Sequence, residues 1–319
     1  MGGLLSRRGA FGLGALAAAP WPAWAGTTPP PDTTGKNIQG IVDAAERMVV
    51  QGTINGHGPY TFVVDTGADR SVIAAEIALQ IGLPPNPDVI VQGIARAVTV
   101  PTVMVDKVEF GNIAMENLVL PVLPRSWLGI DGFLGLDIID DRRVTFDFRH
   151  QQLTINASPS SFLMGSLISG VYNPNESVVR ADGSHGRLKA VNCKVDGVRA
   201  VAFIDSGSQA TIGNTHLADE LEKRGAKYDE KNEVTLTGVT GGAVAGRLMS
   251  MRVIKFGDVD FNQNALIVAD MPVFDVWGLS NRPAIFIGMD FLRLTSELTI
   301  DFSRREYHFK LADLRIASI

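Results

Sequence analysis

Two short stretches of the chain carry an acidic residue in the same local pattern. They are Asp65-Thr66-Gly67-Ala68 and, 140 residues later (205 − 65), Asp205-Ser206-Gly207-Ser208. In each, a run of β-forming residues ends at the aspartate, and a hydroxyl residue and a glycine follow. This pattern predicts a buried strand with a carboxylate at its end, followed by a sharp turn.

Two carboxylates that meet in the folded chain could cleave a bond with water as the only other reactant. One carboxylate would take a proton from the water, and the other would protonate the leaving group. Carboxylates about 3 Å apart do not both ionise easily, so they would share one proton and titrate as a pair. This chemistry needs no metal ion and no cofactor, and the five histidines lack a metal-ligand spacing such as His-x-x-x-His.

A second motif follows each acidic stretch. Phe133-Leu134-Gly135 ends 70 residues after the first aspartate (135 − 65), and Phe286-Ile287-Gly288 ends 83 residues after the second (288 − 205). With these four segments the chain resembles the aspartic proteases of the pepsin and retropepsin group. Members of that group carry Asp, Thr or Ser, Gly, and Ala or Ser in each half, with two apolar residues and a glycine downstream. The resemblance implies an all-β, bilobal, pepsin-like fold built from two retropepsin-like halves with short helices.

The resemblance also assigns roles to the residues of the two acidic stretches. It makes Asp65 and Asp205 the catalytic dyad of an aspartic endopeptidase that acts on polypeptides. Residues that support the dyad are then Thr66, Gly67, Ala68, Ser206, Gly207 and Ser208. We expect the hydroxyl of Ser208 to donate a hydrogen bond to Asp205, which would make Asp205 the more readily ionised member of the pair.

The sequence repeats more than these motifs, which predicts an internal duplication. In each half, a glycine-containing segment joins two strand-like runs and resembles the flap that closes over substrate in the family. The flap candidates are Gly93, Ile94, Ala95, Gly238, Val239 and Thr240. We expect a monomer whose halves are related by an approximate two-fold axis. The expected division is an export signal (1–25), a flexible linker (26–40), an N-terminal half (41–157), a connector (158–186) and a C-terminal half (187–319).

The N-terminal region has the features of an export signal. Arg7-Arg8 precedes a weakly apolar segment, and Ala23-Trp24-Ala25 offers a cleavage site of the small-x-small type. The paired arginines resemble a twin-arginine signal, and the ordinary secretory route is the alternative. The expected location of the protein is therefore the bacterial periplasm or the extracellular space.

Composition excludes several other classes of protein. The chain of 319 residues is 45% hydrophobic and 20% charged, which is typical of globular proteins and sufficient for a substantial core. The net charge of −5 is modest and no basic run is present, so we expect no nucleic-acid partner. After the N-terminal region no apolar stretch reaches about 18 residues, so we expect no membrane span.

Two alternatives remain open at the level of the sequence. The same cleft could hold an extended peptide without cutting it, or the enzyme could act only on itself or on one dedicated partner. Among the other reactive residues, the single cysteine, Cys193, lies in an alternating segment that predicts a buried strand. Asp137, Asp140 and Asp141 precede two arginines, which predicts local salt bridges.

Overall fold

The computed structural model describes residues 47–111, 113–157, 176–183 and 188–311. It also places three short strands nearer the N-terminus, β1 (Phe11–Leu13), β2 (Ala17–Ala18) and β3 (Ile41–Val42). The remainder of the expected signal and linker lies outside the described residues, as does most of the expected connector. None of the helices within the described ranges is long and apolar enough to cross a membrane.

The N-terminal half consists of strands with three short helices between them. Its elements are β4 (Met48–Ile54), β5 (His57–Val64), β6 (Val72–Ala74), α1 (Ala75–Gln80), β7 (Pro85–Gln92), β8 (Ala97–Phe110), β9 (Ile113–Leu123), α2 (Arg125–Leu128), β10 (Gly132–Leu134), α3 (Leu136–Ile139), β11 (Arg142–Asp147) and β12 (Gln152–Ala157).

The C-terminal half repeats this order with one strand added at its start and one additional hairpin. Its elements are β13 (Glu176–Asp182), β14 (Lys189–Val195), β15 (Val198–Ile204), β16 (Ile212–Gly213), α5 (Thr215–Glu222), β17 (Tyr228–Gly238), β18 (Ala243–Ser250), β19 (Val253–Phe256), β20 (Val259–Asn262), β21 (Ala265–Ala269), α6 (Pro272–Val276), β22 (Ala284–Ile287), α7 (Met289–Leu292), β23 (Thr295–Asp301) and β24 (Glu306–Leu311). The strand β13 thus lies within the segment that the sequence marks as a connector.

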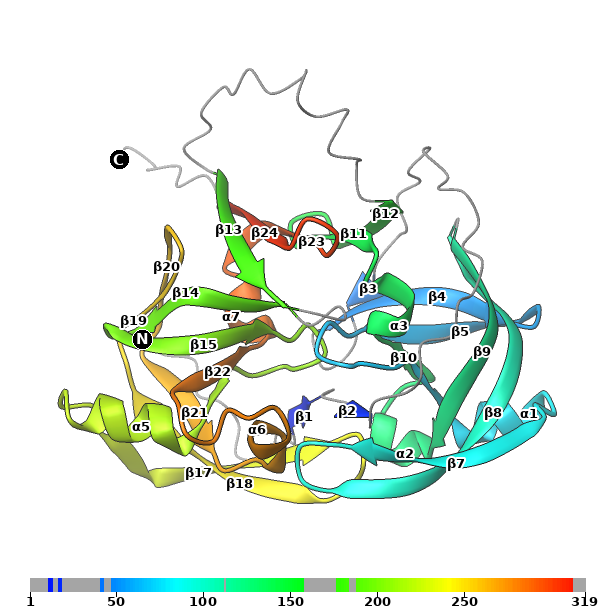
Figure 1. Ribbon diagram of the computed structural model, residues 1–319, viewed down its shortest axis with the longest axis horizontal. Coiled ribbons are helices and arrows are strands. Elements are labelled where there is room, and N and C mark those ends of the chain that lie inside the picture. Colours follow the sequence, from blue (N-terminus) through cyan, green and yellow to red (C-terminus); the bar gives the residue numbers. More distant parts are fainter. Residues whose placement is uncertain are drawn as a thin grey trace, which may run out of the picture.

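Strand pairing follows the same rules in the two halves. In the first, β10 runs parallel to β5 and antiparallel to β6. In the second, β22 runs parallel to β15 and antiparallel to β16. The sheet order β7-β8-β9-β6-β10-β5-β4 corresponds strand by strand to β17-β18-β21-β16-β22-β15-β14. The all-β, bilobal fold expected from the sequence is confirmed, and the two lobes lie side by side in Figure 1.

A tight hairpin precedes each acidic residue and fixes the register of the strand that leads to it. Asn55 and Gly56, between β4 and β5, both have positive φ angles (49° and 76°). Asp196 and Gly197, between β14 and β15, do the same (44° and 82°). Turns with two positive φ angles match the twist of antiparallel strands, and Asn-Gly and Asp-Gly are the residue pairs that adopt them most readily. The hairpins therefore fix the register of β5 and β15.

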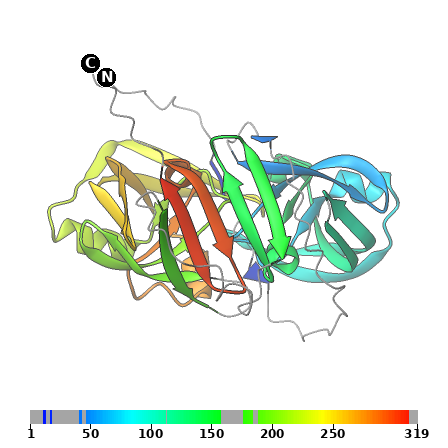
Figure 2. The same cartoon turned by 90° about the horizontal axis from the view of Figure 1, so that it is seen from above.

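A sheet of strands from both halves joins the lobes. Strand β11 of the first half pairs antiparallel with β23 of the second, with Arg143 opposite Asp301. The hydroxyls of Thr145 and Thr299, which are also opposite each other, lie 2.8 Å apart. Figure 2 shows the hairpins β11–β12 and β23–β24 side by side between the lobes. This sheet fixes the distance between the two halves.

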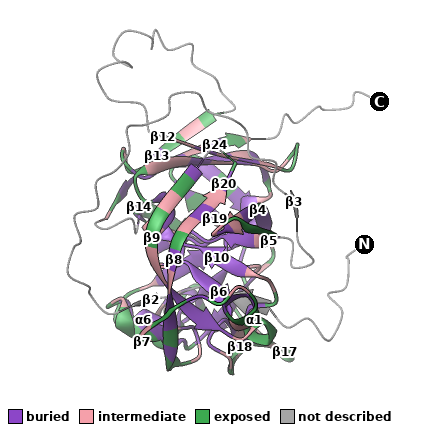
Figure 3. Cartoon of the chain, turned by 90° about the vertical axis from the view of Figure 1, so that its right-hand side faces the viewer, coloured by how far each residue is buried: buried purple, intermediate pink, exposed green. Residues whose placement is uncertain are grey.

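The strands at the centre of each lobe are the most deeply buried. Every residue of β6, β10 and β22 is buried, and Figure 3 shows β6 and β10 in purple at the centre of the N-terminal lobe. Cys193 is fully buried in β14, as the alternation of its segment predicts. Because close-packed interiors resist displacement, these strands are rigid supports for the loops that follow them.

Candidate active site

Each of the two acidic residues is buried and lies directly after a strand. Asp65 follows β5, and its amide donates a hydrogen bond to the carbonyl of Leu134 in β10 (2.9 Å). Asp205 follows β15, and its amide donates to the carbonyl of Ile287 in β22 (3.0 Å). The apolar-apolar-glycine motifs of the sequence are therefore the partner strands that hold the two aspartates in place.

The turn after each aspartate directs two amides at the carboxylate. Oδ1 of Asp65 accepts hydrogen bonds from the amides of Gly67 (2.8 Å) and Ala68 (3.1 Å). The corresponding oxygen of Asp205 accepts from the amides of Gly207 and Ser208, both at 3.1 Å. These donors fix one oxygen of each carboxylate.

The hydroxyl residues after the aspartates connect the two lobes. The amide of Thr66 donates to Oγ of Ser206, and the amide of Ser206 donates to Oγ1 of Thr66, both at 3.1 Å. Each hydroxyl then donates to the opposite lobe, Thr66 to the carbonyl of Ile204 (2.8 Å) and Ser206 to that of Val64 (2.7 Å). This symmetric set of four hydrogen bonds holds the two turns that carry the candidate catalytic residues (the catalytic turns) against each other.

The same turns bring the two carboxylates together. A Cβ atom added to Gly67 would lie 2.8 Å from Oδ1 of Asp205, and a Cβ on Gly207 would clash with the carboxylate of Asp65. Glycine is therefore required at both positions, because each backbone contacts the carboxylate of the other lobe. Oδ2 of Asp65 and Oδ2 of Asp205 are both buried and have no hydrogen-bond partner among the described residues.

Burial and proximity change the acidity of both carboxyl groups. Burial, followed by the charge of the neighbouring Asp205, raises the pKa of Asp65 well above its usual range. Burial raises the pKa of Asp205 to about 7. The backbone donors and the charge of the buried Arg47 lower both pKa values, with a smaller effect. The pair therefore retains a proton into the neutral pH range, and the titration belongs to the two groups together.

The expected role of Ser208 as a hydroxyl donor to Asp205 is wrong. Its Oγ donates to the carbonyl of Ala210 (2.8 Å), and it accepts from the amide of the same residue (3.3 Å). The bond from Ser208 to Asp205 comes from the backbone amide, as it does from Ala68 in the first half. A local turn uses the hydroxyl, so the two halves are alike at this position.

A further pair of carboxylates, which the sequence analysis did not connect with the site, lies behind the catalytic turns. Oδ1 of Asp137 accepts from the amide (2.9 Å) and the hydroxyl (2.7 Å) of Ser71, and that hydroxyl accepts from the amide of Gly135 (2.9 Å). Asp290 binds Thr211 in the same way in the second half. The sequence feature that could have indicated this second pair is the repetition of Gly135-Leu136-Asp137 as Gly288-Met289-Asp290.

Of the expected local salt bridges, that of Asp141 with Arg142 is present (3.4 Å).

Comparison with known protein families agrees with this geometry. A family model described as aspartyl protease matches residues 50–138 and 191–291, one segment in each half. The chain belongs to the aspartyl protease family. No curated protein matches the chain. Both matched segments begin before a catalytic turn and end within or directly after the helix that follows the apolar-apolar-glycine strand.

The flap candidates of the protease lie at the tips of two long hairpins. Gly93, Ile94 and Ala95 connect β7 to β8, and Val239 and Thr240 connect β17 to β18, directly after Gly238. The two tips meet: Nε of Arg96 donates to the carbonyl of Thr240 (3.2 Å), and Oγ1 of Thr240 donates to the carbonyl of Arg96 (3.0 Å). The hairpins thus extend toward each other from opposite lobes, as Figure 1 shows for β7–β8 and β17–β18.

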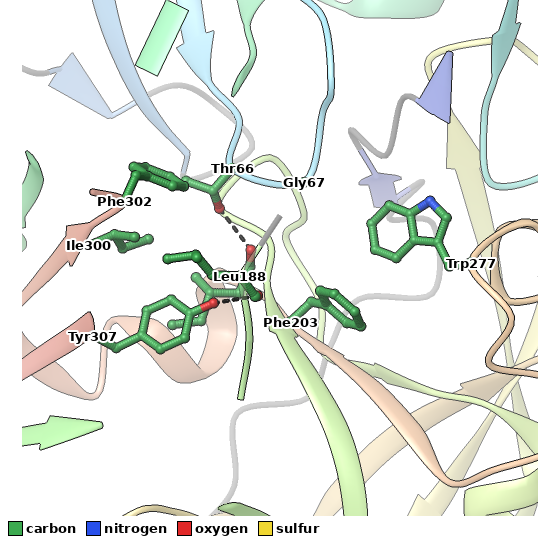
Figure 4. A pocket seen from close by; sticks show the side chains of 9 residues that line it. Thr66, Gly67, Leu188, Phe203, Trp277, Ile300, Phe302 and Tyr307 are labelled. Carbon is green, nitrogen blue, oxygen red and sulfur yellow. Dashed lines mark hydrogen bonds between the residues drawn. The ribbon is translucent and has the colours of Figure 1, made fainter. Parts of the chain in front are cut away.

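A small, mostly apolar cavity lies beside the hydroxyls that connect the lobes (Figure 4). Thr66 reaches its edge, and Phe203 and Trp277 form an aromatic pair there with ring centroids 5.0 Å apart. The Tyr307 hydroxyl, also on the wall, donates to the carbonyl of Leu188 (2.6 Å). Apolar surroundings of this kind strengthen the hydrogen bonds next to them by excluding water.

No group of three or more His, Cys, Asp or Glu side chains within the described ranges is arranged to hold a metal ion. The carboxylates that meet in the site are the two of the dyad, and their nearest polar neighbours are backbone amides.

Proposed function

We propose that this aspartyl protease is an endopeptidase in which Asp65 and Asp205 activate a single water molecule. The observation that carries the proposal is that two buried carboxylates from opposite lobes interact directly, each with an Oδ2 atom to which no other described residue donates a hydrogen bond. Each carboxylate is held by two amides through its other oxygen, so the Oδ2 atoms are the ones that would bind water and substrate.

The reaction would use the one proton that the pair holds. The ionised carboxylate takes a proton from the water as its oxygen attacks the peptide carbonyl carbon, while the protonated carboxyl donates its proton to the carbonyl oxygen. A tetrahedral diol forms. In the second step a hydroxyl of the diol returns a proton to the dyad, the amide nitrogen receives a proton from the dyad, and the C–N bond breaks. The products are a carboxylic acid and an amine, and the dyad is restored.

The lobes and flaps explain why the proposed substrate is an extended polypeptide. The two flap hairpins approach each other from opposite lobes, so a chain that lies between them and the dyad would be held from both sides. Extended backbone can form hydrogen bonds with strands on either side, which favours main-chain recognition over recognition of one side chain.

The proposal is tested by incubating the full chain with a random peptide library between about pH 3 and pH 8 and sequencing the products by mass spectrometry. New ends inside the peptides, absent with the Asp65→Asn variant, are expected. Removal of terminal residues only would contradict endopeptidase action. Binding of library peptides without any cleavage would favour the alternative of a peptide-binding module, and cleavage of the chain itself alone would favour a self-processing enzyme.

Export remains part of the proposal. Paired arginines followed by a small-x-small site support removal of residues 1–25 during transport. Sequencing the N-terminus of the protein recovered from the periplasm of a bacterial host tests this directly. A new N-terminus at Gly26 is expected, and an intact N-terminus in the cytoplasm would contradict it.

A further inference from the structure

The two flap tips differ in sequence, and their differences are complementary. The first tip carries Arg96, whereas the second carries Thr240 followed by the glycines Gly241 and Gly242. The side chain of Arg96 binds the backbone of Thr240, and the side chain of Thr240 binds the backbone of Arg96. Each tip therefore supplies one side-chain donor and one carbonyl acceptor to the other.

Glycines in both tips allow this close approach. A Cβ on Gly93 would lie 2.8 Å from Cγ2 of Thr240, and a Cβ on Gly238 would lie 2.6 Å from Cγ1 of Ile94. Both distances are too short for real atoms. The backbone of each flap therefore touches a side chain of the other.

The tip of the first flap also enters the core of the second half. Ile94 is fully buried and belongs to a cluster whose other buried members all come from the C-terminal half, among them Leu236 and Phe286. Thr240 is fully buried as well. Separation of the tips would expose both side chains to water, so the contact is favoured by the hydrophobic effect in addition to its hydrogen bonds.

A third element supports the contact from outside. The guanidinium of Arg96 lies over the ring of Trp127, 5.4 Å from its centroid. Trp127 belongs to α2 of the N-terminal half, and a Cβ on Gly241 of the opposite flap would lie 2.9 Å from its Cε2 atom. Arg96 is thus held between an aromatic ring of its own half and the carbonyl of the other flap, which orients its planar group.

We infer that Arg96, together with Thr240 and Trp127, forms a latch that holds the two flaps closed over the dyad. This inference rests on the proposed function for its kinetic consequence, because closure pre-organises the cleft for a polypeptide. Arg96 is a positioning residue, since it contacts the flaps and not the reacting carboxyl groups. Such an asymmetric latch is possible because both flap tips belong to one chain and can therefore carry different residues.

The kinetic consequence follows from the closed fraction of the free enzyme. When that fraction falls, the apparent affinity for substrate falls in proportion, because binding must then include closure. The closed complex itself is unchanged, so kcat should change little. Loss of the Arg96 side chain removes the hydrogen bond that its charged guanidinium donates to the carbonyl of Thr240, and its cation–π contact with Trp127. Together these correspond to an increase of about tenfold or more in flap opening.

Hydrogen exchange tests the latch without requiring catalysis, in the chain that begins at Gly26, because β1 and β2 of the proposed signal pair with the flap strands β17 and β7. The Asp65→Asn background prevents self-cleavage, and exchange is measured at the amides of residues 94–96 and 239–241. Arg96→Ala should raise exchange about tenfold at both tips, including the one that carries no substitution. Arg96→Lys should give a smaller rise, because lysine keeps the charge but lacks the planar group. Thr240→Val, of similar volume, tests the reciprocal bond should Arg96→Ala fail to fold.

Arg247→Ala is the matched control. Arg247 also lies on a flap and over an aromatic ring, that of Tyr228 at 3.8 Å, but its ring contact is within its own hairpin. Its loss should leave exchange at both tips unchanged. Unchanged exchange at residues 239–241 in both Arg96→Ala and Thr240→Val would overturn the latch.

A kinetic measurement separates this inference from the proposed function. With a cleavable peptide and an intact dyad, Arg96→Ala should raise KM by the factor by which the closed fraction falls, and should change kcat by less than about threefold. The rise in KM should be smaller than the rise in exchange as long as most molecules stay closed. If exchange rises as expected but no variant cleaves any peptide, the latch stands and the proposed function fails. If peptides are cleaved and Arg96→Ala alters neither KM nor exchange, the proposed function stands and the latch is refuted.

Discussion

At the scale of single residues, two aspartates have their acidity changed by their surroundings. Asp65 and Asp205 have the same intrinsic chemistry as any surface aspartate, but they are fully buried and face each other. Burial disfavours the charged form, and a second carboxylate adds to the effect, so the pair holds a proton at pH values where an exposed aspartate would have lost it. The raised pKa values therefore lower the stability of the folded state near neutral pH.

This penalty predicts how stability depends on pH. Burial raises the pKa of Asp205 to about 7, whereas in the unfolded chain it is about 3.9. Between these values the folded state binds more protons, so the stability contribution of Asp205 is fully present below about pH 4 and is lost as pH rises towards 7. Asp205→Asn should therefore be more stable than the unmodified protein at pH 8, with a smaller difference at pH 4, by urea unfolding.

Asp141→Asn is the control for this measurement. Its side chain is 61% exposed and pairs with Arg142 at the surface, so its loss should alter stability by less than about 1 kcal/mol at any pH. An Asp205→Asn difference that stays constant from pH 4 to pH 8 would contradict the assignment of a raised pKa.

At the scale of elements, each catalytic turn is supported by the short helix that follows the apolar-apolar-glycine strand. The amide of Leu136, at the start of α3, donates to the carbonyl of Ala68 (2.8 Å), and that of Met289, at the start of α7, donates to the carbonyl of Ser208 (2.9 Å). Helix and turn approach so closely that the residue before each helix must be glycine, Gly135 or Gly288.

A single methyl group at this contact should displace the catalytic turn. In Gly135→Ala the new Cβ would lie 2.6 Å from the carbonyl carbon of Arg70 and 2.8 Å from the carbonyl oxygen of Ala68. Both are backbone atoms of the loop after Asp65, so the loop has to move. Because a displacement of about 1 Å can reduce a rate by about 10²-fold, we expect a loss of that size in kcat, measured with a cleavable peptide.

Gly82→Ala is the matched control for this prediction. Gly82 has a positive φ of 67° and no atom within 4 Å of an added Cβ, so the substitution should destabilise the fold by about 1 kcal/mol and leave kcat unchanged. Equal kcat values for the two variants would refute the role of the contact.

The elements also show what the sequence could and could not predict. Strands that end at Asp65 and Asp205, the hairpin turns before them and the duplicated order are local or periodic features, and the sequence indicates them correctly. The hydroxyl of Ser208 could not be oriented in advance, because two acceptors were within reach and the turn geometry selects the carbonyl of Ala210. Residue type alone does not distinguish such alternatives.

Contacts between elements that are distant in sequence could not be predicted from the sequence either. Asp137 was predicted to pair with neighbouring arginines, but its bonds to Ser71 depend on how α3 packs behind the catalytic turn. The contact of Arg96 with Thr240 depends on the relative position of the lobes, which the interlobe sheet sets. Such contacts follow from the assembled fold, and local propensity carries no information about them.

At the scale of the whole molecule, contacts at several places join the two lobes within the described residues. The hydroxyls of Thr66 and Ser206 connect the catalytic turns, β11 pairs with β23, and the flap tips meet at Arg96 and Thr240. In the proposed mechanism each lobe supplies one carboxylate, so neither half alone would have a complete site. Activity would then depend on the folding of both lobes.

This coupling predicts that the two lobes unfold together. Trp127 reports on the N-terminal lobe and Trp277 on the C-terminal lobe, so variants that retain only one of these tryptophans give a probe for each. Fluorescence should show the same midpoint in urea for both probes, as expected for a two-state transition. Midpoints separated by about 1 M or more would show that the lobes unfold independently.

The central claim is that Asp65 and Asp205 act as one catalytic unit, and a double-mutant cycle tests it most directly. We predict that Asp65→Asn and Asp205→Asn each reduce kcat/KM by about 10³-fold or more, and that the double variant is no less active than either single one, because residues of one unit show non-additive losses. Substantial activity in either single variant, or a double variant whose loss is the product of the two single losses, would contradict the account.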